Sequence, residues 1–361
     1  MQKVITHAAE MPSQQVLVQK HLDWNRVGKR LEEFSHIQSH FPEKVLRKGI
    51  NKPPYYCHYM AWRLGTWPDN NDDLFELFDR LLGIASGLEN WKKEFSNFKS
   101  SCDFAEFWSL LWQLQVAHFF MQSGDASWNP KGPDLAVRTG HGTFYVECYA
   151  YRKSFGVENF IEELMRKVDK NIRVEHQSNL PFALPSDNTR NQFLDELFHP
   201  YLNPEYLDNK RKEAQQSWPA NLHVPVNAKN FRVYLEGPTQ AYAPGLNASG
   251  GPSNYRALAI KEGIESKKNS NDLVNHRPNI LAINYLLSPD YQMSCNALAE
   301  MGEKLPSIDF GKSLDAVLLA SCGIDCKLSS NNSLPILTRW SKDVARHKFN
   351  IKGVQFVEIQ C

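Results

Sequence analysis

Two acidic residues in the middle of the chain have the types and the setting for metal-dependent chemistry. Asp134 follows Gly132 and Pro133, and Glu147 stands in an otherwise apolar and aromatic run from 144 to 149. An acid in a half-buried strand needs a partner, and a divalent cation shared with Asp134 is one natural choice. Hard oxygen ligands suit Mg²⁺, which keeps several waters and leaves room for a phosphate. A site of this kind can activate water and stabilise charge on a phosphodiester.

The elements that must position these acids follow from the local patterns. A strongly apolar helix is predicted over 103–122, and Gly124, just after it, is expected to end it. Two strands follow, over 133–139 and 143–151, and Gly140 and Gly142 mark the turn between them. An amphipathic helix is predicted over 155–177. Asp134 therefore opens one strand of a hairpin, and Glu147 lies inside its partner.

In this order of motifs and elements, the chain resembles the PD-(D/E)XK nuclease superfamily. Members place a helix first, then Pro-Asp at a hairpin strand, then Glu-x-Lys on the partner strand, then a second helix. The resemblance is good over 102–176, weaker over 254–322 and absent over 1–100. It implies an α/β fold of the restriction-endonuclease-like kind, in which a mixed sheet is flanked by helices, here with a helical N-terminal region.

The resemblance also implies a function. The chain is then expected to be a Mg²⁺- or Mn²⁺-dependent hydrolase of phosphodiester bonds, with Asp134 and Glu147 as the metal ligands. Nucleic acid, and specifically DNA, is the expected partner, with a role in restriction or mobile-element defence. Because cutting two strands often requires two copies, a homodimer is a further expectation.

Two positions depart from the family pattern. The slot for lysine, two residues after Glu147, holds Tyr149, whose hydroxyl can form hydrogen bonds but carries no positive charge. Lys153 lies further along the same predicted strand face and is expected to replace that lysine, with Tyr149 as a helper. Many members carry a glutamate on the first helix, and Gln113 occupies that place here. The resulting expected site comprises Asp134, Glu147, Lys153, Tyr149 and Gln113.

The same departures support two other interpretations. One is an inactive protein that keeps the nuclease fold and binds nucleic acid or a partner protein, which Tyr149 and Gln113 favour. The other is an α/β enzyme of unrelated chemistry, with a pocket lined by the loop 236–256. Basic residues on or near two predicted helices, 155–177 and about 255–268, are candidates for phosphate contacts or for an ordinary solvated surface. They are Arg152, Lys153, Arg166, Lys167, Lys170 and Arg173 after the Glu147 strand, and Lys261, Lys267 and Lys268 after the glycine-containing loop 243–253.

Cysteines and histidines do not suggest a second centre. Cys322 and Cys326 have no second pair of ligands nearby and are interpreted as ordinary core or loop residues. Cys148 is interpreted as a buried, inert thiol, and His118 as a core histidine in an apolar helix. No phosphate-binding loop or dinucleotide fingerprint is present, so no nucleotide cofactor is expected.

The rest of the chain sets the domain prediction. A helical region over 1–100 is expected to precede an α/β domain over 101–361 that contains an insert at about 177–253. The further strands of a mixed sheet are predicted at 231–235, 280–286, 314–320 and 354–359. A net charge of +1, seven scattered cysteines, and the absence of a signal-like or membrane-spanning apolar run together favour a cytoplasmic protein that does not enter membranes.

Overall fold

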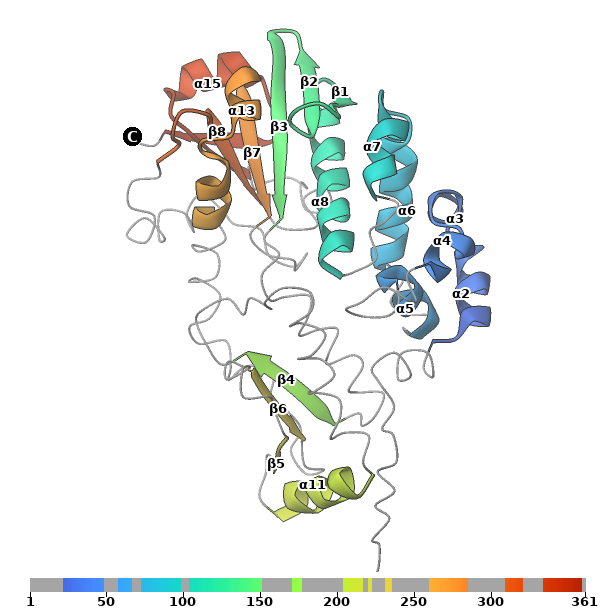
Figure 1. The fold of residues 1–361 in the computed structure, drawn as a ribbon. Coiled ribbons are helices and arrows are strands. Elements are labelled where there is room, and N and C mark those ends of the chain that lie inside the picture. The colour runs from blue at the N-terminus through green and yellow to red at the C-terminus, as the bar shows by residue number, and fades with distance from the viewer. Residues whose placement is uncertain are drawn as a thin grey trace, which may run out of the picture.

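The computed structural model describes most of the predicted α/β core and parts of the remaining chain. The described residues are 22–48, 58–66, 73–98, 104–150, 171–176, 204–216, 220–222, 231–235, 260–284, 309–320 and 334–358. Within them, a seven-stranded mixed sheet has the order β1-β2-β3-β7-β8-β9-β10, with helices packed against it (Figure 1). The expected α/β class with a mixed sheet and flanking helices is confirmed.

The N-terminal part of the described chain is helical, as predicted, but its helices are short. They are α2 (Trp24–Leu31), α3 (Ser35–His40), α4 (Glu43–Arg47), α5 (Tyr59–Thr66), α6 (Asp73–Ala85) and α7 (Trp91–Phe98). Asp23 begins α2 as its N-cap, because its carboxylate accepts hydrogen bonds from the backbone N–H groups of Asn25 and Arg26, at 3.0 and 3.2 Å. Turns at 32–34 and 86–90 separate α2 from α3 and α6 from α7.

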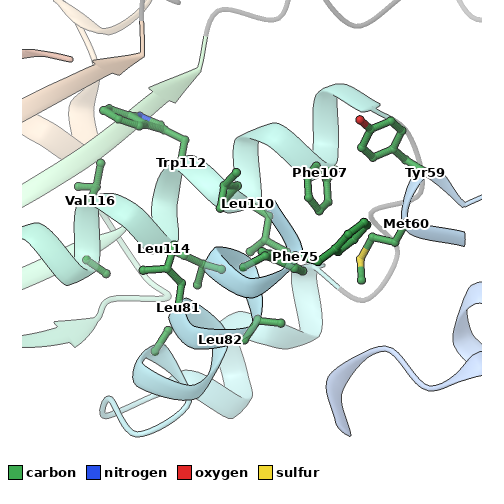
Figure 2. Close-up of a cluster of buried hydrophobic side chains, with 14 of the residues drawn as sticks. Tyr59, Met60, Phe75, Leu81, Leu82, Phe107, Leu110, Trp112, Leu114 and Val116 are labelled. Carbon is green, nitrogen blue, oxygen red and sulfur yellow. The ribbon is translucent and has the colours of Figure 1, made fainter. Parts of the chain in front are cut away.

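Helix α8 (Phe104–Met121) lies between these helices and the sheet (Figure 1). It is apolar on nearly every side because it packs on two neighbours, as an internal helix does. Trp112 anchors it to the sheet, since its indole N–H donates to the carbonyl of Ala282 at 3.2 Å. Figure 2 shows the opposite side of this core, where Phe107 and Leu110 meet Phe75 and its neighbours from the N-terminal helices.

The first three strands of the large sheet form an antiparallel meander. They are β1 (Asp125–Trp128), β2 (Leu135–Thr139) and β3 (Gly142–Ala150). Gly142 closes the β2–β3 turn at φ +133°, a backbone conformation that favours glycine. The predicted hairpin is confirmed, whereas β1 was not predicted.

The other half of the sheet is mostly parallel, and three of its four strands are buried. It contains β7 (Asn279–Asn284), β8 (Ala316–Ala320), β9 (Leu334–Thr338) and β10 (Val354–Glu358). β7 runs parallel to β3 and to β8, β9 is antiparallel to β8, and β10 is parallel to β9. Every residue of β7, β8 and β9 is buried, which explains their continuous apolar sequences.

Helices cover both faces of this sheet. On the face of Phe144 lie α8 and α15 (Lys342–Phe349), because the Phe144 ring contacts Phe120 and Phe349 at centroid distances of 5.5 and 5.6 Å. Side chains alternate along β3, so Glu147 and Tyr149 point to the other face. That face is covered by the helical residues 260–267, where Gly263 lies against Tyr149 and Ile283, and by α13 (Asn271–Asn275).

A second, three-stranded sheet belongs to the segment between β3 and residue 260. Its order is β4-β6-β5, formed by β4 (Ile172–His176), β6 (Phe231–Leu235) and β5 (Ala220–Asn221), and α11 (Pro204–Gln216) packs on it. Figure 1 shows this unit apart from the large sheet. The predicted helix over 155–177 is wrong at its end, because 172–176 is a strand; tertiary pairing with β6 outweighs the local pattern.

The described helices also bear on membrane association. None of them is long and apolar enough to cross a bilayer.

Candidate functional site

Asp134 and Glu147 lie near each other at the end of the hairpin opposite its turn. Asp134 is the residue before β2, whose pairing with β3 ends with Leu135 opposite Val146, the residue before Glu147. The carboxylate of Asp134 accepts a hydrogen bond from the backbone N–H of Cys148 at 2.7 Å. The hairpin thus brings the two predicted acids together.

Electrostatics distinguish Asp134 from an ordinary surface carboxylate. Burial, and next the negative charge of Glu147, raise the pKa of Asp134 to about 7. Glu94, from α7, adds to the rise, while the Cys148 N–H and the Lys267 ammonium oppose it. An ionised Asp134 is therefore short of positive charge, which is the condition that a bound cation relieves.

Lys267 supplies a cation to the other acid. Its ammonium group forms an ion pair with Oε1 of Glu147, and the side chains are only 31% and 17% exposed. Lys267 is the last residue of the helical stretch 260–267, which lies over the Glu147 face of the sheet. The site consequently contains two carboxylates and one ammonium group, contributed by β3, the start of β2 and a helix.

Tyr149 faces the same helix. Its hydroxyl donates to Oε1 of Glu262 at 3.2 Å. A Cβ atom placed on Gly263 would come within 2.9 Å of Tyr149 Cδ1 and of Ile283 Cδ1, so the helix backbone approaches the sheet closely here. The residue in the lysine slot therefore contacts the helix that carries Lys267.

Asp134 and Glu147 form only part of a ligand set for a divalent cation. Among the described residues, no group of three or more His, Cys, Asp and Glu side chains is placed to hold a metal ion. A two-carboxylate site remains compatible with Mg²⁺, which retains several waters rather than requiring a full set of protein ligands. The under-compensated charge of Asp134 is the observation that fits such an ion.

The other predicted site residues are placed as follows. Gln113 lies in α8, and its Oε1 is buried without a hydrogen-bond partner. The charges that act on Asp134 and the ion pair of Glu147 come from other residues. Lys153, Arg152 and the loop 236–256 lie outside the described residues. The structure thus brings Asp134, Glu147 and Tyr149 into one region and adds Lys267.

The sequence predicts Lys267 as a phosphate contact or a solvated lysine, and not as a partner of Glu147. A signal was nevertheless present. Ile260 and Ile264 are buried, and Lys267 follows them at the i+7 and i+3 positions of the same helical face. A lysine on the buried face of an amphipathic helix requires a partner, and Glu147 meets that requirement.

Cys148 contributes its backbone rather than a reactive thiol. Burial, followed by the charges of Asp134 and Glu147, raises the pKa of the Cys148 thiol well above its ordinary value. The thiolate is the nucleophilic form of cysteine, so this residue is unsuited to attack. The interpretation of Cys148 as an inert thiol agrees with this environment.

Comparisons with known proteins give no relative that could assign the site. No protein-family model matches the chain, and neither the curated proteins nor the solved structures contain a significant match.

Proposed function

We propose that the chain is a metal-dependent nuclease that hydrolyses phosphodiester bonds, with DNA as the substrate. The observation that carries this proposal is the cluster of Asp134, Glu147 and Lys267, in which Lys267 pairs with Glu147 and both of their charges act on Asp134. Two nearby carboxylates beside an ammonium group combine a place for a cation with a donor for water or a phosphate oxygen. Either charge type alone is common on protein surfaces, and the combination supports this chemistry.

The arrangement of elements supports membership of the PD-(D/E)XK superfamily as part of the same proposal. α8 precedes the hairpin of β2 and β3, and the helical residues 260–267 precede β7, which pairs with β3. The resemblance placed the second helix at 155–177, directly after β3, and residues 155–170 lie outside the described residues. In this proposal the helical residues 260–267 take the place of that second helix beside the site.

The proposed roles follow from charge and position. Asp134 and Glu147 would hold Mg²⁺ or Mn²⁺, and the ion would lower the pKa of bound water and stabilise charge on the phosphate. Lys267, which pairs with Glu147, would donate hydrogen bonds that orient the attacking water or a phosphate oxygen. The lysine role is thus reassigned from Lys153 to Lys267.

A second candidate function rests on the same ion pair. Because Lys267 already neutralises Glu147 within the chain, the cluster has an internal cation without any metal. A protein that keeps this fold and binds nucleic acid or a partner protein without cutting is therefore the alternative.

A cleavage assay separates these functions. Wild type, Asp134→Asn and Lys267→Met would be incubated with plasmid and single-stranded DNA in Mg²⁺, Mn²⁺ or EDTA. We expect metal-dependent cutting that falls at least about 100-fold in both variants, because each removes a group acting at the reaction centre. Lys312→Met is the control, since it removes an exposed lysine near the same helix.

Two results would count against the nuclease. Cutting that persists in EDTA, or that survives in Asp134→Asn, would remove the acid pair from the chemistry. An absence of cutting by folded wild type with either metal would favour the binding function, which DNA retention measured in the same samples would then test.

A further inference from the structure

The helix 260–267 approaches the sheet closely beside the candidate site. Gly263 leaves no room for a Cβ atom, because that atom would overlap the Tyr149 ring and Ile283 at 2.9 Å. A separation below 3.0 Å between such carbon atoms requires that the backbone or the ring move. The Tyr149 hydroxyl adds a hydrogen bond to Glu262, the residue before Gly263. The ring and the hydroxyl of one tyrosine therefore hold one turn of this helix.

The end of the same helix is held independently. Ser313 Oγ donates to the carbonyl of Lys267 at 2.7 Å, and the Ser313 N–H donates to the carbonyl of Lys268 at 3.2 Å. Lys267 lies at this anchor, one helical turn after Gly263. Its side chain must span from the helix to Glu147 on β3, so its reach depends on how closely the helix approaches the sheet.

We propose that Tyr149 and Gly263 form a docking contact that fixes the helix of Lys267 on the sheet and thereby positions the Lys267 ammonium group against Glu147. This inference rests on the proposed function only for its catalytic consequence. Tyr149 is then a positioning residue. It occupies the slot in which the resembled family carries a lysine, and it holds in place the helix that supplies the lysine instead.

Two substitutions perturb the dock in different ways. Gly263→Ala adds the methyl group that overlaps Tyr149 and Ile283, and so moves the helix outward while raising its intrinsic helix propensity. Tyr149→Phe keeps the ring and removes the hydroxyl that donates to Glu262. Gly28→Ala is the matched glycine control, because at this position in α2 a Cβ would meet only the flexible end of Glu43, at 3.3 Å.

Tyr145→Phe is the matched tyrosine control. Tyr145 lies on the same strand face as Tyr149 and at the same spacing from Glu147, and its ring contacts His276, the residue after α13. A loss caused merely by a polar change beside Glu147 would appear in both tyrosine variants, whereas a loss of docking would appear in Tyr149→Phe alone.

The position of the lysine can be measured without activity. Metal-free protein would be treated briefly with an acetylating reagent, and the labelling of Lys267 would be compared by mass spectrometry with that of Lys261, an exposed lysine on the same helix. We expect several-fold faster labelling of Lys267 in Gly263→Ala and a smaller rise in Tyr149→Phe, with no change in either control. Equal labelling in all proteins would overturn the docking role.

Cleavage kinetics provide the second readout. We expect kcat to fall about tenfold in Gly263→Ala, with KM for DNA unchanged, because a sub-ångström displacement of a reacting group lowers the rate of the chemical step. A fall in kcat without increased labelling of Lys267 would contradict the proposal. If wild type does not cleave, the proposed function fails and labelling alone decides the docking role. If Gly263→Ala does not fold, Tyr149→Phe decides it.

Discussion

Replacing Asp134 by asparagine should stabilise the metal-free protein, and by more at pH 8 than at pH 5. In the folded protein, burial and the Glu147 charge raise the pKa of Asp134 from 3.8 to about 7. The folded state therefore holds this proton more tightly than the unfolded state does. Well below about pH 4, Asp134 is protonated in both states and does not lower the stability of the folded protein. As the pH rises from about 4 to about 7, the folded state loses stability, and the loss is complete above the folded pKa.

The magnitude follows from the shift. A difference of about 3 pH units corresponds to about 4 kcal/mol at most. Because Asp134 is only half-buried, solvent reduces this cost. We expect the free energy of unfolding of Asp134→Asn to exceed that of wild type by about 2 kcal/mol at pH 8 and by under about 1 kcal/mol at pH 5. Asparagine is nearly isosteric, and its side-chain carbonyl can still accept the hydrogen bond from the Cys148 N–H.

Urea unfolding in EDTA at the two pH values would measure this difference. Asp125→Asn is the control, because it removes an exposed carboxylate from the neighbouring strand β1. Equal changes at pH 5 and pH 8, or a variant less stable than wild type at pH 8, would refute the reasoning about charge at this site.

Three further outcomes are expected. Mg²⁺ should raise the melting temperature of wild type but not of Asp134→Asn, because a ligand bound only to the folded state stabilises it; equal shifts in a thermal-melt assay would contradict the assigned ligand. Arg277→Met should lower the free energy of unfolding, measured in urea, by about 2 kcal/mol, because Asp315, which is 1% exposed, loses its guanidinium partner. Adding Asp315→Asn should recover part of this stability, and no recovery would count against the charge explanation. Trp112→Phe should lower the free energy of unfolding by about 1–2 kcal/mol in the same assay, because the carbonyl of Ala282 loses a buried donor. An unchanged urea midpoint would show that this hydrogen bond does not anchor α8.

The hairpin and the buried strands could be predicted because their signals are local. Two glycines mark the β2–β3 turn, and the apolar sequence of β7 is explained by burial on both faces. Strand β1 was missed because its four residues follow the helix directly and lack a clear alternation of apolar and polar types. The strand 172–176 was missed because it depends on pairing with β6, far along the chain.

The acid pair was accessible from the sequence for the same reason. Asp134 and Glu147 lie next to the last pair of one hairpin, Leu135 and Val146, so their proximity follows from local strand register. Lys267 and Glu147 are separated by 120 positions, and their contact depends on how a helix docks after a long insert. Local spacing favoured Lys153, because the sequence alone gives no distance between β3 and that helix.

The same long separation has a consequence for folding. β7 pairs with β3 on one side and β8 on the other, so the β3 edge stays open until residues 279–284 have been made. During synthesis, the β1–β3 meander and α8 can form early from local contacts, whereas closing the sheet requires a high-contact-order step. The chain therefore completes its acidic site late, and the nine-residue edge of β3 is the segment most open to mispairing before that step.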